Sequence, residues 1–157
     1  KLSSHKPPCT VFAVSVTISI IGQFIVHLSS LLGTLYLCEL FSPADQLSGS
    51  PDGRFRPNLV NSAVYILSSV MQINNFIVNY RGHPFTQSIK ENQQLWRSVL
   101  AIYSVLFIAC TEVLEPLNDL LQLAKFPSPE FRSCLICLLA ANFGLTWIVE
   151  KLSQKLE

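Results

Sequence analysis

The sequence predicts an all-α, polytopic membrane protein with four transmembrane helices. Half of its 157 residues are hydrophobic and only 13% are charged, whereas about a quarter of the residues of soluble domains are charged. Four intervals contain no Asp, Glu, Lys or Arg, and they cover residues 7–38, 57–80, 98–111 and 133–149. A bilayer core of about 30 Å needs about 20 helical residues, so each interval, together with its apolar flanks, predicts one span.

The four spans are expected at about residues 10–40, 58–79, 95–114 and 134–149. The first exceeds the bilayer thickness, so it must tilt or project beyond the surface. The second begins directly after Pro57, a residue type that suits a helix start. The third is the weakest, because it needs Trp96 as an interfacial anchor and Arg97 to extend toward water. The fourth ends near Glu150, placed at the membrane interface, or continues to Leu156.

Basic residues predict the orientation of these spans. Four spans place both ends of the chain on one side of the membrane, and with that side in the cytosol seven Lys and Arg are cytosolic and four are not. The seven are Lys1, Lys6, Arg81, Lys90, Arg97, Lys151 and Lys155, and the four are Arg54, Arg56, Lys125 and Arg132. Because cytosolic loops carry the excess of basic residues, we expect both ends to be cytosolic.

The same orientation assigns the connectors of a single membrane domain of residues 1–157. The 80–94 connector is then cytosolic, and the 41–57 and 115–133 connectors are non-cytosolic. The chain begins with Lys1, and the apolar stretch that follows is too long for a signal peptide. We therefore expect a fragment of a longer protein.

The second span carries an unusual number of amide side chains. Gln72, Asn75 and Asn79 share one helix face at spacing i, i+3, i+7, and Asn61 extends this face. Two interpretations stay open: hydrogen bonds between helices that stabilise a bundle, and a polar wall of a substrate cavity. His27, near the middle of the first span, has the same two interpretations. A lone histidine is a poor metal site.

The residues that usually carry chemistry form no catalytic motif. The sequence has no Gly-x4-Gly-Lys phosphate loop, no Gly-x-Ser-x-Gly and no His-Glu-x-x-His, so the segment itself is predicted to hold no catalytic residue, metal or cofactor. Glu112 and Glu115 are interpreted as markers of the membrane interface. A disulfide among Cys38, Cys110 and Cys134 stays open. The net charge of +1 and the lack of a basic run argue against nucleic-acid binding.

Two stretches carry a resemblance to a known family. The first runs from Phe55 to Tyr65 and contains Pro-Asn-Leu-Val-Asn-Ser. The second runs from Phe76 to Asn92 and contains Asn-Tyr-x-Gly-x-Pro-Phe. Together they resemble the C-terminal membrane region of the subfamily 5A P-type ATPases, the endoplasmic-reticulum branch. The resemblance depends on matching Asn, Tyr, Gly and Pro residues rather than on generic apolar residues. It covers nearly the whole chain.

This resemblance implies the C-terminal part of a P-type ATPase membrane domain, with the four spans as its seventh to tenth helices. Proteins of that family hydrolyse ATP with magnesium through an Asp-Lys-Thr-Gly motif, which is absent from this sequence. They are associated with extracting misinserted transmembrane helices from the endoplasmic-reticulum membrane. The implied partners are the lipid bilayer, the remaining membrane helices and cytosolic domains of the parent ATPase, and transmembrane-helix substrates.

The connector after the second span is a second candidate site. Its candidate residues are Gly82, Pro84, Phe85, Glu91 and Asn92. Gly82 and Pro84 predict a tight turn. One interpretation is a rigid connector, and the other is a contact with the cytosolic domains that couples the membrane helices to phosphorylation.

Two other classes of protein stay open. The first is a stand-alone four-span scaffold that binds partners without catalysis. The second is a piece of a secondary transporter, which inverted repeats would favour, and no internal repeat is visible.

Overall fold

The computed structural model describes residues 12–42, 57–83 and 86–156. Within these ranges the chain forms helices and no strand, so the all-α prediction is confirmed. The helices are α1 (Val14–Phe41), α3 (Leu59–Asn79), α4 (Gln93–Thr111), α5 (Glu115–Leu120) and α6 (Pro129–Gln154). Compared with the expected spans, α6 is extended at both ends, and α4 starts and ends slightly earlier.

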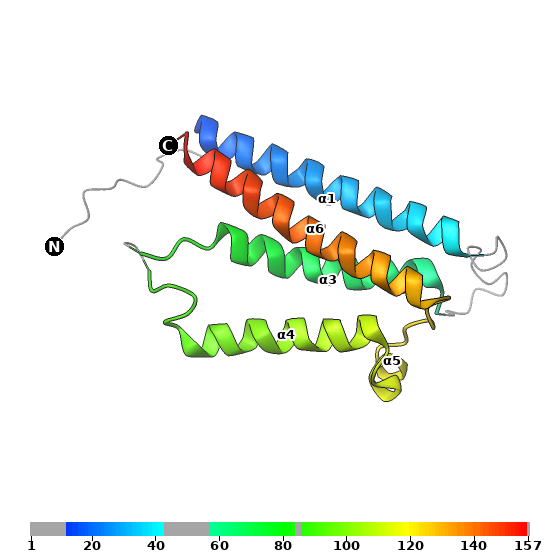
Figure 1. Cartoon of the computed structure of the whole chain (residues 1–157). Coiled ribbons are helices and arrows are strands. Elements are labelled where there is room, and N and C mark those ends of the chain that lie inside the picture. Colours follow the sequence, from blue (N-terminus) through cyan, green and yellow to red (C-terminus); the bar gives the residue numbers. More distant parts are fainter. Residues whose placement is uncertain (1–11, 43–56, 84–85, 157) are drawn as a thin grey trace.

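The four long helices alternate in direction along the chain (Figure 1). α1 and α6 lie side by side, α3 packs against both of them, and α4 packs against α3 and α6. We call the end of the bundle that holds the 80–92 connector the loop end, and the opposite end the α5 end. The start of α1 and the ends of α3 and α6 therefore meet at the loop end.

Polar side chains determine where three helices begin. Asn58, Asn92 and Ser128 cap α3, α4 and α6, and each accepts a hydrogen bond from the backbone N–H three residues later, at 2.7, 3.1 and 3.2 Å. Such caps satisfy a donor that the helix itself leaves unpaired. Pro129 follows its cap directly, where a missing N–H costs nothing.

Two glycines on α1 allow a close approach to α6. A Cβ atom on Gly22 would lie 2.6 Å from Val149 Cγ1, and one on Gly33 would lie 3.1 Å from Leu138 Cδ1. Membrane helices use small residues in this way to pack closely, since lipid is as apolar as their side chains. The close contact of α1 with α6 therefore depends on these glycines, because a larger side chain at either position would push the two helices apart.

The buried residues differ between the two ends of the bundle. The apolar core lies at the α5 end and consists of Cys38, Leu59, Ala63, Ile66, Cys110, Phe126, Phe131 and Leu135. Toward the loop end, beside the apolar Val78 and Val99, the buried side chains include five polar ones: Ser15, Ser19, Gln23, Glu150 and Ser153. Buried polar groups need partners, so the loop end is where a site is most expected.

Three described helices, α1, α4 and α6, are long and apolar enough to cross a membrane. α3 has 21 residues but does not meet the same criterion of hydropathy, because its amides lower its mean hydropathy. The prediction of four spans is therefore confirmed for three helices. The sequence ranks residues 95–114 as the weakest span, whereas in the structure α3 is the long helix whose hydropathy is too low for a span.

Candidate functional site

A polar groove lies between α1 and α3 toward the loop end. It encloses about 680 Å³. Its lining combines three apolar side chains, Ile20, Phe24 and Phe76, with Ser19, Gln23, His27, Gln72, Asn75 and Asn79. Four of the five residues that the sequence proposes for a substrate pathway therefore line one groove. The fifth, Asn61, lies in the first turn of α3 at the α5 end and is not part of the lining.

Two of the amides are paired across the groove. Gln23 Nε2 donates to Asn79 Oδ1 at 3.0 Å, and Asn79 Nδ2 donates to Gln23 Oε1 at 2.9 Å. Asn79 Nδ2 also lies 2.6 Å from Asn75 Oδ1. This reciprocal pair joins α1 to α3 and supports the interpretation of the amides as interhelical contacts.

Gln72 behaves differently from its neighbours. It is exposed on α3, it lines the groove, and its side chain has no hydrogen-bond partner within the described part of the chain. An unpaired amide that faces hydrocarbon is costly. Contacts within the described part of the bundle therefore leave the Gln72 amide without a hydrogen-bond partner.

Glu150 on α6 is buried beside this groove, with 4% of its surface exposed. Its carboxylate accepts hydrogen bonds from Ser19 Oγ, from Gln23 Nε2 at 3.2 Å and from Gln154 Nε2 at 2.9 Å. Arg81 lies 4.0 Å away. The sequence places Glu150 at the membrane interface as the end of a span, and the structure adds that it joins α1 to α6. A polar stripe at Asn142, Thr146 and Glu150, spaced i, i+4, i+8, is the signal that predicts this burial.

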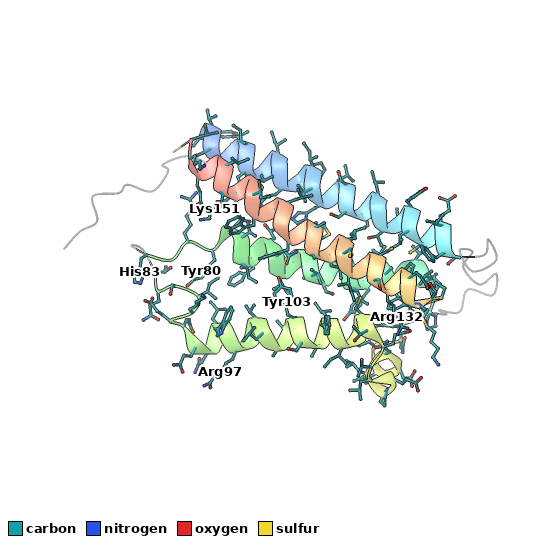
Figure 2. The ribbon with its side chains drawn as sticks, in the orientation of Figure 1. Tyr80, His83, Arg97, Tyr103, Arg132 and Lys151 are labelled. Carbon is teal, nitrogen blue, oxygen red and sulfur yellow. The ribbon has the colours of Figure 1, made fainter. Side chains whose placement is uncertain are left out.

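A second polar network joins all four long helices near their middle. Asn74 Nδ2 on α3 donates to Asn142 Oδ1 on α6 at 3.0 Å, and Tyr103 on α4 donates to Asn74 Oδ1. Asn142 Nδ2 donates to Ser30 Oγ on α1 at 2.8 Å and lies 3.2 Å from His27 Nδ1. Figure 2 shows Tyr103 in the space between α4 and α3. Sequence reasoning missed Tyr103 and Asn142, because their partners lie on other helices, 29 positions from Tyr103 and 68 positions from Asn142.

The contact with Asn142 determines the chemistry of His27. Because Asn142 Nδ2 is a donor, His27 Nδ1 must accept, and the ring proton resides on Nε2. His27 Nε2 is buried and has no partner among the described residues. His27 therefore offers one unused N–H donor beside the polar groove that it lines.

The 80–92 connector is held by its own hydrogen bonds. Glu91 Oε2 accepts the Ser88 backbone N–H at 2.8 Å and lies 2.9 Å from His83 Nε2. The hydrogen bond from Ser88, followed by that from His83, holds the pKa of Glu91 below its usual value. A Cβ atom on Gly82 would lie 3.1 Å from Ser88 Cα, so the close approach of these two backbone segments explains why a glycine is present at position 82. These contacts favour a rigid connector; two further candidates, Pro84 and Phe85, lie outside the described residues.

Other sequence expectations can be compared with the described ranges. Cys38, Cys110, Cys134 and Cys137 are free thiols in the structure. Within the described ranges, no group of three or more His, Cys, Asp or Glu side chains is arranged to hold a metal ion.

The fold and the buried polar networks define this chain as an all-helical bundle of membrane-span type. No protein-family model matches it. It is 34% identical over 99% of its length to the endoplasmic reticulum transmembrane helix translocase spfA of Aspergillus fumigatus. It is 30% identical over 98% of its length to the endoplasmic reticulum transmembrane helix translocase of Schizosaccharomyces pombe. A probable manganese-transporting ATPase, PDR2 of Arabidopsis thaliana, is 38% identical over 80% of the chain.

The predicted resemblance to a membrane segment of subfamily 5A P-type ATPases is thereby confirmed. The chain spans only 12%, 13% and 10% of these three relatives. It is similar to one segment of each, consistent with a C-terminal position.

Proposed function

We propose that this chain is the C-terminal membrane bundle of a P-type ATPase that extracts mislocalised transmembrane helices from the endoplasmic-reticulum membrane. The support is the similarity, over 99% and 98% of the chain, to proteins named as transmembrane helix translocases of that membrane. ATP and magnesium would act in other parts of the parent protein, because this sequence lacks the Asp-Lys-Thr-Gly motif. The segment itself would carry no catalytic residue.

The first role proposed for the segment is support. Helices in lipid are held by close packing and hydrogen bonds, since the hydrophobic effect does not favour helix association there. The Gln23–Asn79 pair and the Asn74–Asn142 contact supply such bonds between three helices. A bundle cross-linked in this way is suited to be a fixed wall against which other helices of the parent move.

The second proposed role is to form one wall of the substrate pathway. The observation that carries it is Gln72, an exposed and unpaired amide beside a groove that also contains Asn75, Asn79 and the free His27 N–H. A misinserted helix brings polar flanking residues into the membrane, and these need hydrogen-bond partners there. The groove offers both donors and acceptors to such residues.

The pathway role is tested in the full-length protein with Gln72→Leu and Asn75→Leu, alone and together. We expect slower extraction of a mislocalised helix with normal expression, because the groove loses its unpaired amide. Asn61→Leu is the matched control, since it makes the same kind of change on α3 outside the groove. Normal extraction by the double variant would remove the pathway role and leave the supporting role.

The orientation and coupling proposals depend on the same parent protein. Both ends of the segment and the 80–94 connector are proposed to be cytosolic, with connectors 41–57 and 115–133 in the lumen.

A contact of Gly82, Glu91 and Asn92 with the cytosolic domains would couple ATP hydrolysis to the membrane helices. Gly82→Leu would then lower the stimulation of ATPase turnover by substrate, and unchanged stimulation would leave the connector a purely structural element.

The alternative function is a stand-alone membrane scaffold that binds partners without catalysis. The low coverage of the relatives, between 10% and 13% of their length, is the observation that keeps this alternative open. The reading frame upstream of Lys1 distinguishes the two. An Asp-Lys-Thr-Gly motif several hundred residues upstream identifies the ATPase, and an unrelated sequence there identifies the scaffold.

A further inference from the structure

A second polar cavity lies at the α5 end, far along the bundle from the groove described above. It encloses about 480 Å³. Its lining contains three acidic and two basic side chains, with the full set being Glu112, Glu115, Asn118, Asp119, Leu123, Lys125 and Arg132. Both signs of charge therefore face one cavity. Figure 2 places Arg132 at this end, close to α5.

Most of these charges are already paired. Glu112 lies 3.4 Å from Arg132 and accepts the Phe126 backbone N–H at 2.8 Å. Lys125 lies 3.3 Å from Glu115, and both of these side chains are largely exposed. Such exposed pairs are weak and exchange readily for other partners. Lys125 and Glu115 are therefore available to a charged ligand, whereas Glu112 and Arg132 form the more buried wall.

Asn118 supplies an independent sign of a missing partner. It is 8% exposed, and its Nδ2 donates to Ala109 O at 3.1 Å, which fixes the orientation of the amide. Its Oδ1 is buried and has no hydrogen-bond partner among the described residues. A buried acceptor without a donor is rare in folded proteins. Asp119, the next residue, is exposed and also lines the cavity, and its carboxylate has no partner among the described residues, so two unpaired acceptors line one cavity.

The surroundings of the cavity place it at a membrane surface. Val113, Leu114 and Leu120, which flank or belong to α5, are 79%, 50% and 79% exposed. A short helix with apolar side chains on its open face is typical of a segment that lies in the headgroup region of a bilayer. The end of α4, one of the helices apolar enough to cross a membrane, directly precedes it. The ligand within reach is therefore a lipid headgroup.

A separate apolar groove lies along α4. It encloses about 410 Å³ between α3, α4 and α6. Two of its residues, Cys110 and Ile136, lie within about one helical turn of Glu112 and Arg132 in the sequence. A headgroup in the cavity would have a path for one of its acyl chains in this groove.

We propose that the α5-end cavity binds the headgroup of an aminophospholipid such as phosphatidylethanolamine. Its primary ammonium group donates to Asn118 Oδ1 and to the Asp119 carboxylate, and its phosphate faces Lys125 and Arg132. Phosphatidylcholine carries the same phosphate and charge, but its quaternary ammonium group has no N–H to donate. The unpaired acceptors therefore select the primary amine.

The test is native mass spectrometry of the full-length protein with equal amounts of phosphatidylethanolamine and phosphatidylcholine of identical acyl chains. We expect about tenfold (about 1.4 kcal/mol) stronger retention of phosphatidylethanolamine. Asp119→Ala should abolish most of this preference, and Asn118→Leu should do the same. Glu130→Gln is the control, because it removes one exposed acid at the same end outside the cavity and should keep the preference.

Two results would overturn the proposal. Equal retention of the two lipids by the unmodified protein would show that the acceptors select no amine. An equal preference in the unmodified protein and in Asp119→Ala, which alters an exposed side chain and leaves the Asn118 bond to Ala109 intact, would place the lipid elsewhere. Soluble phosphoethanolamine at the same concentration should fail to displace the lipid; full displacement would contradict the role of the acyl groove.

Discussion

Asn74 on α3 donates a hydrogen bond to Asn142 on α6 at 3.0 Å, and neither side chain has any exposed surface. Through Asn142 the same contact reaches Ser30 and His27 on α1, and through Asn74 it reaches Tyr103 on α4. One amide pair therefore links every long helix of the bundle. In lipid, where apolar packing alone does not choose one arrangement of helices, this pair is suited to select the native one.

Asn142→Leu tests that role of the pair. The substitution leaves the buried Asn74 Nδ2 donor without its acceptor, which costs about 1–3 kcal/mol; Ser30 loses the bond from Asn142 but keeps its own bond to Val26 O. We expect a clear loss of stability in unfolding experiments in detergent micelles. Asn61→Leu is the control, because Asn61 is exposed. Equal stabilities of the two variants would mean that the network contributes nothing to the fold.

Gly22→Ala tests the close contact of α1 with α6. The added methyl group would lie 2.6 Å from Val149 Cγ1, and valine in a helix has few other rotamers to adopt. Overpacking of this kind costs about 1–3 kcal/mol, so the melting temperature should fall. Gly144→Ala is the matched control, since no atom lies within 4 Å of its added Cβ. A melting temperature lowered as much by Gly144→Ala as by Gly22→Ala would contradict the packing argument.

The sequence predicts the amide-rich helix and four of the nine residues that line the groove, but not which amides pair. Gln72 and Asn74 are two positions apart, yet one is exposed without a partner and the other is fully buried. The difference depends on Asn142, which is 68 positions away from Asn74, and no local pattern encodes such a distance. Hydropathy counts every amide as equally polar, which is why α3 does not meet the criterion for a membrane span although its most buried amide is satisfied.

Glu150→Leu tests the polar end of the bundle. The substitution removes the acceptor that Ser19, Gln23 and Gln154 share; Gln23 keeps its bond to Asn79, but the buried Ser19 hydroxyl loses its acceptor, which costs about 1–3 kcal/mol. We expect lower stability and faster hydrogen exchange at the start of α1, where Ser19 and Gln23 lie. Lys151→Leu changes the exposed neighbour of Glu150 and should leave both unchanged. Exchange that is equally slow in both variants would show that Glu150 is not needed to hold α1.

The 80–92 connector should loosen in acid. Hydrogen bonds from Ser88 and His83 hold the pKa of Glu91 below its usual value, so the folded connector favours the ionised carboxylate. For a lowered pKa the stabilisation is complete above the pKa of the unfolded chain and is lost as the pH falls through the lower, folded pKa. Limited proteolysis of the connector should therefore increase below about pH 4.3, the usual range for Glu.

Glu91→Gln separates this titration from a general effect of acid. The variant cannot ionise at position 91, so its connector should be cleaved faster than the native one at neutral pH. It should also show little further increase in acid, because the group that titrates has been removed. Glu130→Gln, which removes an exposed acid at the opposite end of the bundle, should keep the native pH profile. A connector that stays resistant in the Glu91→Gln protein at neutral pH would show that its shape depends on Gly82 and the backbone hydrogen bonds instead.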